Sequence, residues 1–173
     1  DVQYFKKSGV ATVVAAAGFT LGTPQATTSG TSFNFSGIPA GTKLIIITFQ
    51  GVSLSGTDLL YVQLGDSGGI ETTGYTNTGV KDTATVISES GGTTSAFVIR
   101  TIIAADAFSG IMTLALANSS TFLWVSNHSG RSADDSAQFG GGDKALSAEL
   151  TQITITRSGT NTFDGGAVNI SYQ

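Results

Sequence analysis

Cysteine is absent from this 173-residue chain, proline occurs twice, and charged residues make up only 12% of it. Without cysteine, neither a disulfide framework nor a thiolate metal site can form. Ordinary globular domains carry about 25% charged residues. A chain this poor in charge must cover its surface with uncharged polar groups or bury part of it against other copies of itself. We expect both.

Clustered positive charge and long apolar runs are also scarce. The net charge is −4, and only Lys6 and Lys7 form an adjacent basic pair. Phosphate binding depends on clusters of Lys and Arg, so we expect no nucleic-acid partner. The apolar segment 11–21 contains Gly18 and is shorter than the roughly 18 residues of a membrane-spanning helix. We expect no membrane span, although the segment and the preceding lysine pair also fit a signal peptide.

What the chain has in abundance is short strand-like segments separated by turn residues, from Thr31 onward. Glycine alone occurs 23 times. A strand and a turn every eight to twelve residues is typical of an all-β sandwich or barrel. The only helix candidate is 10–18, so very little helix is expected. The predicted strands are 32–35, 43–52, 59–64, 83–88, 96–103, 110–117, 122–127, 145–157 and 167–172.

We therefore predict an all-β fold, an antiparallel, jelly-roll-like β-sandwich over residues 31–173 with an extended N-terminal arm over residues 1–30. Residues 152–156 alternate Ile with Gln and Thr, as a half-buried antiparallel strand does. Residues 44–47 are all apolar and do not alternate. They predict a central strand with apolar cover on both faces, and a neighbouring subunit is one way to supply the second cover.

Two glycine-rich motifs suggest catalysis or phosphate binding, but their surroundings favour turns. Residues 65–69 read Gly-Asp-Ser-Gly-Gly, as around the nucleophile of trypsin-like proteases, yet the single histidine follows Ser67 instead of preceding it. We interpret this motif as a turn in which Asp66 and Ser67 bond their own backbone. The triple glycine 140–142 is not followed by a Lys-Ser/Thr pair or a helix, so we interpret it as a flexible loop or bulge.

The titratable residues give no strong catalytic or metal pattern. His128 is interpreted as a loop residue, because one histidine without cysteine cannot form the usual zinc sets. Asp134 and Asp135 are the only adjacent carboxylates, and we interpret them as solvated loop residues. Two carboxylates also make a glycosidase, but spacing along the chain cannot identify such a pair. We predict no catalytic residue, no metal and no cofactor.

Aromatic rings stack on sugars, and amide or carboxylate groups bind sugar hydroxyls. This chemistry defines a set of candidate contacts with a glycan or protein partner. Phe122 and Trp124 share one face of a predicted strand, so we assign them instead to the core or a subunit interface. The candidate contacts are Tyr75, Asn127, His128, Arg131, Asp134 and Asp135.

Several multi-residue segments occur in the same order as in a known type of module. They are residues 36–43, 49–57, 63–66, 70–75 and 160–172. These segments resemble a module of bacteriophage and prophage tail-fibre or other virion structural proteins, and the resemblance spans residues 31–173. It implies a non-enzymatic virion protein that forms a homotrimer, either at a fibre tip that touches the host or as a decoration protein on the head.

The leading functional hypothesis is thus a trimeric tail-fibre or receptor-binding tip module in the virion, with loops that contact host-surface polysaccharide. The arm would attach it to other virion proteins, with Tyr4, Phe5, Lys6 and Lys7 as candidate contacts. One alternative is a capsid decoration protein that stabilises the head. Another is a glycan depolymerase, which requires two carboxylates in a groove, and a weaker one is a secreted lectin-like adhesion module.

Overall fold

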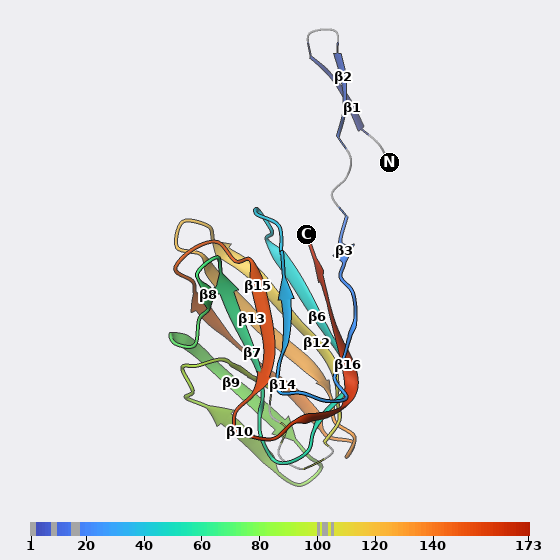
Figure 1. The fold of residues 1–173 in the computed structure, drawn as a ribbon, viewed down its shortest axis with the longest axis vertical. Coiled ribbons are helices and arrows are strands. Elements are labelled where there is room, and N and C mark those ends of the chain that lie inside the picture. Colours follow the sequence, from blue (N-terminus) through green and yellow to red (C-terminus); the bar gives the residue numbers. More distant parts are fainter. Residues whose placement is uncertain (1–2, 8–9, 15–17, 100, 102–103, 105) are drawn as a thin grey trace.

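The computed structural model describes residues 3–7, 10–14, 18–99, 101, 104 and 106–173. In this part of the chain strands and turns alternate and no helix occurs, so it holds no helix that could cross a membrane. Every strand pair is antiparallel. Two sheets pack face to face (Figure 1), and the predicted all-β, antiparallel sandwich is confirmed.

The larger sheet has nine strands. Their order is β10-β9-β14-β13-β12-β6-β16-β3, and β4 also pairs with β16. The strands are β3 (Thr20–Leu21), β4 (Gln25–Ala26), β6 (Leu44–Leu54), β9 (Tyr75–Asp82), β10 (Ile87–Gly91), β12 (Phe108–Asn118), β13 (Leu123–Arg131), β14 (Ala137–Ala145) and β16 (Phe163–Tyr172).

The smaller sheet has the order β11-β7-β15-β5, with β8 paired to β7. Its strands are β5 (Phe33–Ser36), β7 (Leu60–Asp66), β8 (Gly69–Ile70), β11 (Phe97–Ile99) and β15 (Gln152–Arg157). The chain passes repeatedly between the sheets, from β5 to β6, back to β7, and again through β9, β11, β12, β15 and β16. This repeated exchange between two antiparallel sheets gives the sandwich its jelly-roll-like path.

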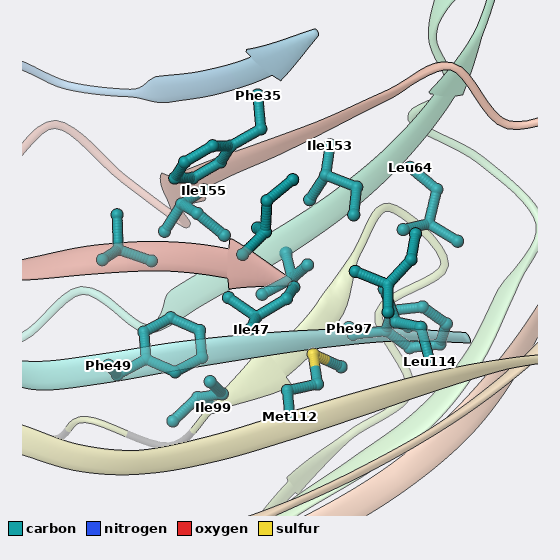
Figure 2. Packing of buried hydrophobic residues seen from close by; sticks show 14 of the residues in the cluster. Phe35, Ile47, Phe49, Leu64, Phe97, Ile99, Met112, Leu114, Ile153 and Ile155 are labelled. Atoms are coloured by element: carbon teal, nitrogen blue, oxygen red, sulfur yellow. The ribbon is translucent and has the colours of Figure 1, made fainter. Parts of the chain in front are cut away.

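The core fills the space between the sheets (Figure 2). Ile47 of β6 points into it, toward Ile153 and Ile155 of β15. These three side chains and that of Ile45 are fully buried in the core. Burying such a side chain contributes about 1.5–3 kcal/mol. The alternation predicted for residues 152–156 is confirmed. The central position predicted for residues 44–47 is confirmed too, because β6 lies between β12 and β16.

Glycines on the inner face of the large sheet allow close packing. A Cβ atom at Gly79 would lie 2.6 Å from the Val98 carbonyl oxygen of β11, and one at Gly142 would lie 2.0 Å from the Thr76 carbonyl oxygen. The triple glycine 140–142 therefore belongs to the middle of β14, and its interpretation as a loop or bulge was wrong. Local sequence favours a turn there, but close contact with neighbouring chain segments requires the glycines.

Two other predicted strands differ from the structure. The predicted strand 83–88 begins in a turn, where Thr83 N donates to the Val86 carbonyl oxygen at 2.9 Å. The sequence analysis did not predict β9, the strand that precedes this turn. β9 contains Gly79 and several polar residues, so its sequence resembles a loop. The predicted strand 145–157 is divided, because residues 146–151 leave the large sheet and β15 begins at Gln152 in the small one.

The N-terminal segment includes a separate hairpin. β1 (Gln3–Lys7) and β2 (Val10–Val14) pair with each other and are drawn apart from the sandwich in Figure 1. Residues 10–14 of the helix candidate 10–18 are thus a strand. β3 and β4 add to β16 of the sandwich, so part of the predicted arm is sheet.

Candidate functional site

The Gly-Asp-Ser-Gly-Gly motif forms the turn between β7 and β8. Asp66 Oδ1 accepts a hydrogen bond from Gly68 N at 2.7 Å, and Gly69 has a φ of 125°. Asp66 Oδ2 accepts from the Ser147 hydroxyl at 2.5 Å. These hydrogen bonds, that from Ser147 first, hold the Asp66 pKa below its usual value. The prediction of a turn with an aspartate bonded to its own backbone is confirmed.

Tyr75, a predicted contact residue, is buried at the start of β9 and unavailable to an external ligand. Its hydroxyl accepts from Leu64 N at 2.7 Å and donates to the Glu71 carbonyl oxygen at 3.0 Å. Burial raises the pKa of this phenol. The ring packs edge-on against Phe97, with centroids 5.0 Å apart, and the Lys144 amine lies 5.5 Å from its centroid.

Lys144, which is buried, and Glu71, which is partly buried, form an ion pair beside that ring. The amine contacts Glu71 Oε2 and donates to the Ala145 carbonyl oxygen at 2.6 Å, while Ser147 N donates to Glu71 Oε1 at 2.7 Å. Burial acts to raise the pKa of Glu71, but the hydrogen bonds from Lys144 and Ser147 outweigh it and hold that pKa below its usual value. The pair fastens the 71–75 segment to the end of β14.

His128 lies in β13 on the inner face of the large sheet, 3% exposed. Its interpretation as a loop residue was wrong, because β13 continues to Arg131 and the turn follows at residues 132–136. Neither ring nitrogen has a hydrogen-bond partner among the described residues. Burial lowers the pKa of the imidazole to about 4, so the ring is neutral at neutral pH and cannot contact a surface glycan.

The remaining predicted contacts lie at different places around the β13–β14 hairpin. Asn127 is exposed on the outer face of β13. Arg131 and Asp135 form an exposed ion pair, 2.5 Å long, at the hairpin end. Asp134 points the other way, toward Lys81. The structure thus brings Arg131 and Asp135 together and separates Asp134 from them.

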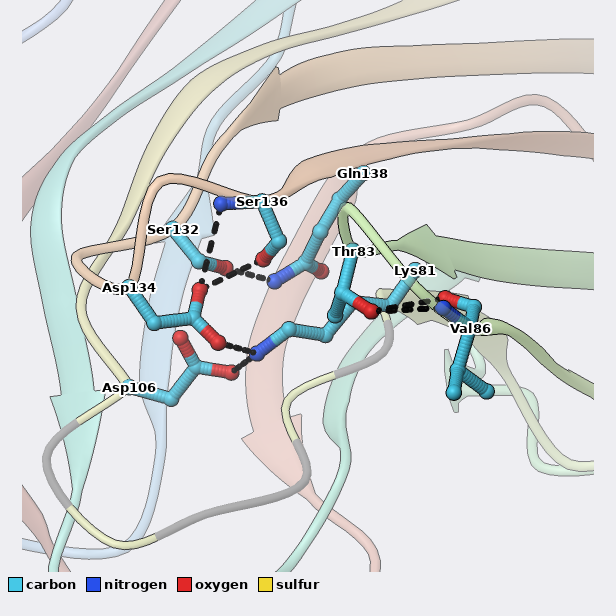
Figure 3. Close-up of polar contacts among 8 residues, drawn as sticks. All are labelled: Lys81, Thr83, Val86, Asp106, Ser132, Asp134, Ser136 and Gln138. Carbon is cyan, nitrogen blue, oxygen red and sulfur yellow. Dashed lines mark hydrogen bonds and ion pairs between the residues drawn. The ribbon is translucent and has the colours of Figure 1, made fainter.

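A buried cation between two carboxylates is the most unusual polar cluster of the described residues (Figure 3). Lys81 Nζ lies 2.5 Å from Asp106 Oδ2 and 3.0 Å from Asp134 Oδ2. The side chains of Lys81, Asp106 and Asp134 are 1%, 0% and 34% exposed. Sequence reasoning missed this cluster, since its members come from β9, from the approach to β12 and from the β13–β14 turn.

Ser136 completes the cluster by orienting Asp134. Its hydroxyl donates to Asp134 Oδ1 at 2.5 Å and its backbone N donates to the same oxygen at 3.3 Å. The Ser136 hydroxyl contributes most to lowering the pKa of Asp134; burial opposes it, and the Lys81 amine adds to the lowering. Asp134 is therefore ionised at neutral pH. Asp106 Oδ1 is buried without a hydrogen-bond partner among the described residues.

Part of the outer face of the large sheet, three rows deep over five neighbouring strands, is nearly free of charge, whereas the next row on this face carries Arg131 and Asp82. We call the fifteen positions in three cross-strand rows the outer patch, and Asp143 is the only charged residue among them. Ile111, Val125 and Phe139 are 47%, 45% and 46% exposed. The rows are Thr48-Ile111-Ser129-Phe139-Val80, Ile46-Thr113-Asn127-Gly141-Thr78 and Leu44-Ala115-Val125-Asp143-Thr76.

The outer face of the small sheet is polar by comparison. Asn34 Nδ2 donates to Gln152 Oε1 at 3.2 Å, and the Thr154 hydroxyl donates to Asn34 Oδ1 at 3.2 Å. A cavity of about 300 Å³ lies beside this region, bordered by Asn34, Gln25 and Tyr172. No charged side chain is among its described lining residues. The described part of the chain also contains no cluster of three or more His, Asp or Glu suited to a metal ion.

Comparison of the chain with protein families, curated proteins and solved structures found no match.

Proposed function

We propose that this chain is a structural protein of a bacteriophage virion that assembles as a homotrimer through the outer patch of its large sheet. The observation that carries the proposal is the single charge among the fifteen positions of the patch, in a sheet face that is open in one subunit. The outer faces of antiparallel sheets that meet water are polar. A face this poor in charge is typical of an interface between copies.

Three large apolar side chains give the patch its contact area. Ile111 and Phe139 flank Ser129 from the strands on either side of it, and Val125 lies four residues from Ser129 along β13. Each is nearly half exposed in a single subunit. Covering them removes apolar surface from water at about 25 cal/mol per Å². Asn127 lies inside the patch, so we assign it to the subunit interface rather than to a glycan.

The hairpin end that carries Arg131 and Asp135 lies beyond the three rows of the patch and stays free in this arrangement. We propose that these two residues face outward and contact host-surface polysaccharide, because guanidinium and carboxylate groups bind sugar hydroxyls. Tyr4, Phe5, Lys6 and Lys7 belong to β1 and remain candidates for attachment to other virion proteins. Their side chains lie outside the part of the chain that the structure describes.

The depolymerase alternative needs two carboxylates that reach a substrate. Asp106 is fully buried, and both Asp106 and Asp134 point at the Lys81 amine. These two carboxylates therefore do not favour that alternative. The decoration-protein alternative shares the fold and the trimer. It differs from the fibre in its partner, because the trimer would clamp neighbouring capsid subunits and bind no sugar, and in its copy number.

Labelling intact phage particles tests the proposal. Antibody against the purified chain, followed by electron microscopy and quantitative mass spectrometry of the particles, should locate a small number of copies at a tail appendage. Many copies spread over the head would instead indicate the decoration protein. Absence of the chain from purified particles would contradict the virion assignment.

A glycan array probed with the wild-type protein and with Arg131→Ala tests the sugar contact separately.

A further inference from the structure

Lys81 presents a buried amine to a buried carboxyl group, and a second carboxylate lies within reach. The amine nitrogen is 2.5 Å from Asp106 Oδ2 and 3.0 Å from Asp134 Oδ2, and Figure 3 shows it pointing between the two groups. Lys81 comes from the inner face of β9, whereas Asp106 precedes β12, and β14 and β13 separate these two strands in the sheet. A nucleophile, an electrophile and a proton acceptor thus meet inside the sandwich.

We propose that Lys81 and Asp106 join in an intramolecular isopeptide bond, with Asp134 as the group that relays the proton. The inference does not depend on the proposed virion function, because it concerns only chemistry within one chain. It assigns Lys81, Asp106 and the partly exposed Asp134 a role in self-modification rather than in binding.

The first requirement is a neutral amine beside a neutral carboxyl group, and the hydrogen bond between the two side chains provides a route to that state. The side chains of Lys81 and Asp106 are 1% and 0% exposed, so this hydrogen bond is shielded from bulk water. A proton that moves from Nζ to Asp106 Oδ2 along their hydrogen bond produces both neutral forms without exchange with solvent. Asp106 Oδ1 has no hydrogen-bond partner among the described residues. Asp134 Oδ2 lies 3.0 Å from the amine nitrogen, so this carboxylate is placed to accept a proton from it.

All atoms and protons of the bond-forming step are then accounted for by Lys81, Asp106 and Asp134. The Lys81 nitrogen attacks Cγ of Asp106, and a nitrogen proton passes to Asp134 Oδ2. Asp134 returns this proton to the departing hydroxyl group as the bond from Cγ to Oδ2 breaks. One water molecule leaves, one amide remains with Oδ1 as its carbonyl oxygen, and Asp134 is again a carboxylate. No oxidant, reductant or co-reactant is required.

Proximity supplies the second requirement. Since Cγ is bonded to Oδ2, the amine lies within about 4 Å of the atom it attacks, near the roughly 3–3.5 Å of a reactive approach. The fold thus holds the reactants together, and such intramolecular reactions are far faster than their bimolecular counterparts. Asp134 is 34% exposed, so the released water has a path to solvent on that side.

Lys144, the second lysine that is buried among the described residues, provides an internal comparison. Lys144 also contacts a carboxylate, Glu71 Oε2, but its further contact is the Ala145 carbonyl oxygen rather than a second carboxylate. A carbonyl oxygen cannot carry the proton to the leaving hydroxyl. Glu71 is also 22% exposed, and its second oxygen accepts from Ser147 N. We therefore expect the Lys144 pair to remain an ion pair.

The decisive measurement is the intact mass of the purified, folded full chain after incubation at neutral pH and denaturation. The mass should be lower than that of the sequence by one water, about 18 Da. Trypsin should then fail to cut at Lys81 and should yield a branched product joining residues 44–100 to residues 101–131. A full, unreduced mass would overturn the proposal, and so would a water loss that maps to Asp164-Gly165, where a succinimide would have the same mass.

Variants assign the roles. Lys81→Arg keeps the positive charge but should have the full mass expected from its sequence. Asp134→Asn should also have its full mass, or should lose water far more slowly than the wild-type protein. Lys144→Arg is the matched control and should retain the deficit. Circular dichroism of each variant shows whether it is folded. A deficit that persists in folded Lys81→Arg, or an undiminished rate in folded Asp134→Asn, would contradict the assigned roles.

Discussion

The imidazole of His128 covers Gly140 of the neighbouring strand so closely that a Cβ atom on Gly140 would lie 2.5 Å from the ring carbon Cε1. The same Cβ would lie 2.2 Å from the Thr78 carbonyl oxygen. Gly140→Ala should therefore destabilise the fold by about 2–3 kcal/mol, as overpacking does. Urea denaturation measures this loss. Gly18→Ala is the control, because a Cβ at Gly18 meets no atom within 4 Å, and it should leave the midpoint unchanged.

The depressed pKa of His128 makes stability depend on pH. The imidazole is neutral in the fold down to about pH 4, whereas in the unfolded chain it binds a proton below its ordinary pKa of 6.5. The unfolded state therefore binds more protons between these values, and stability is lost as pH falls. We expect a loss of about 2 kcal/mol between pH 7 and pH 5.

Denaturation of the wild-type protein and of His128→Gln at both pH values checks this expectation. Three carboxyl groups, those of Asp66, Glu71 and Asp134, also have lowered pKa values in the fold. Their contributions to stability are lost at more acidic pH, as pH falls from the usual carboxyl range through these lowered values. The glutamine variant should lose most of the dependence between pH 7 and pH 5. If the folded His128→Gln variant lost as much stability between pH 7 and pH 5 as the wild-type protein does, His128 would not be the source of the pH dependence.

Lys144 secures the 71–75 segment through Glu71. Lys144→Met removes the cation but leaves Glu71 partly buried at 22% exposure, so we expect a loss of about 2 kcal/mol. Hydrogen exchange at Leu64 N, which donates to the Tyr75 hydroxyl at 2.7 Å, should also quicken. Unchanged stability and exchange in the variant would show that the pair contributes nothing to holding this segment.

Arg131 and Asp135 are largely exposed, with side chains 65% and 85% accessible. Such exposed pairs contribute little to stability. Arg131→Ala should therefore keep the wild-type denaturation midpoint while it weakens binding to host polysaccharide on the array. Binding that is unchanged in this variant would remove the hairpin end from the proposed contact surface.

The sequence was sufficient for the all-β fold class, the turn at Asp66 and the central position of β6, because these follow from local alternation and turn chemistry. It was insufficient where a residue's role depends on distant parts of the chain. In the sequence Gly140 resembles a loop residue, whereas in the structure it lies in a strand beneath the ring of His128. Tyr75 resembles a surface aromatic in the sequence, whereas in the structure its hydroxyl accepts a hydrogen bond from Leu64 N.

The polar cluster shows the same limit. Lys81, Asp106 and Asp134 are far apart in the sequence. They meet only because the fold places β9 beside the segments that precede β12 and β14. The exposure of Phe139 follows from the register of β14 against β13. The sequence does not reveal this register, because the three glycines at 140–142 interrupt the alternation of polar and apolar residues.

The mass of the native assembly in solution tests the central claim most directly. Light scattering on the purified chain should give three times the 17.6 kDa of a single copy. Replacing Ile111, Val125 and Phe139 by serine should give single copies that keep the wild-type β-sheet circular dichroism. A wild-type chain that stays at 17.6 kDa at micromolar concentration would contradict the claim that the outer patch joins three subunits.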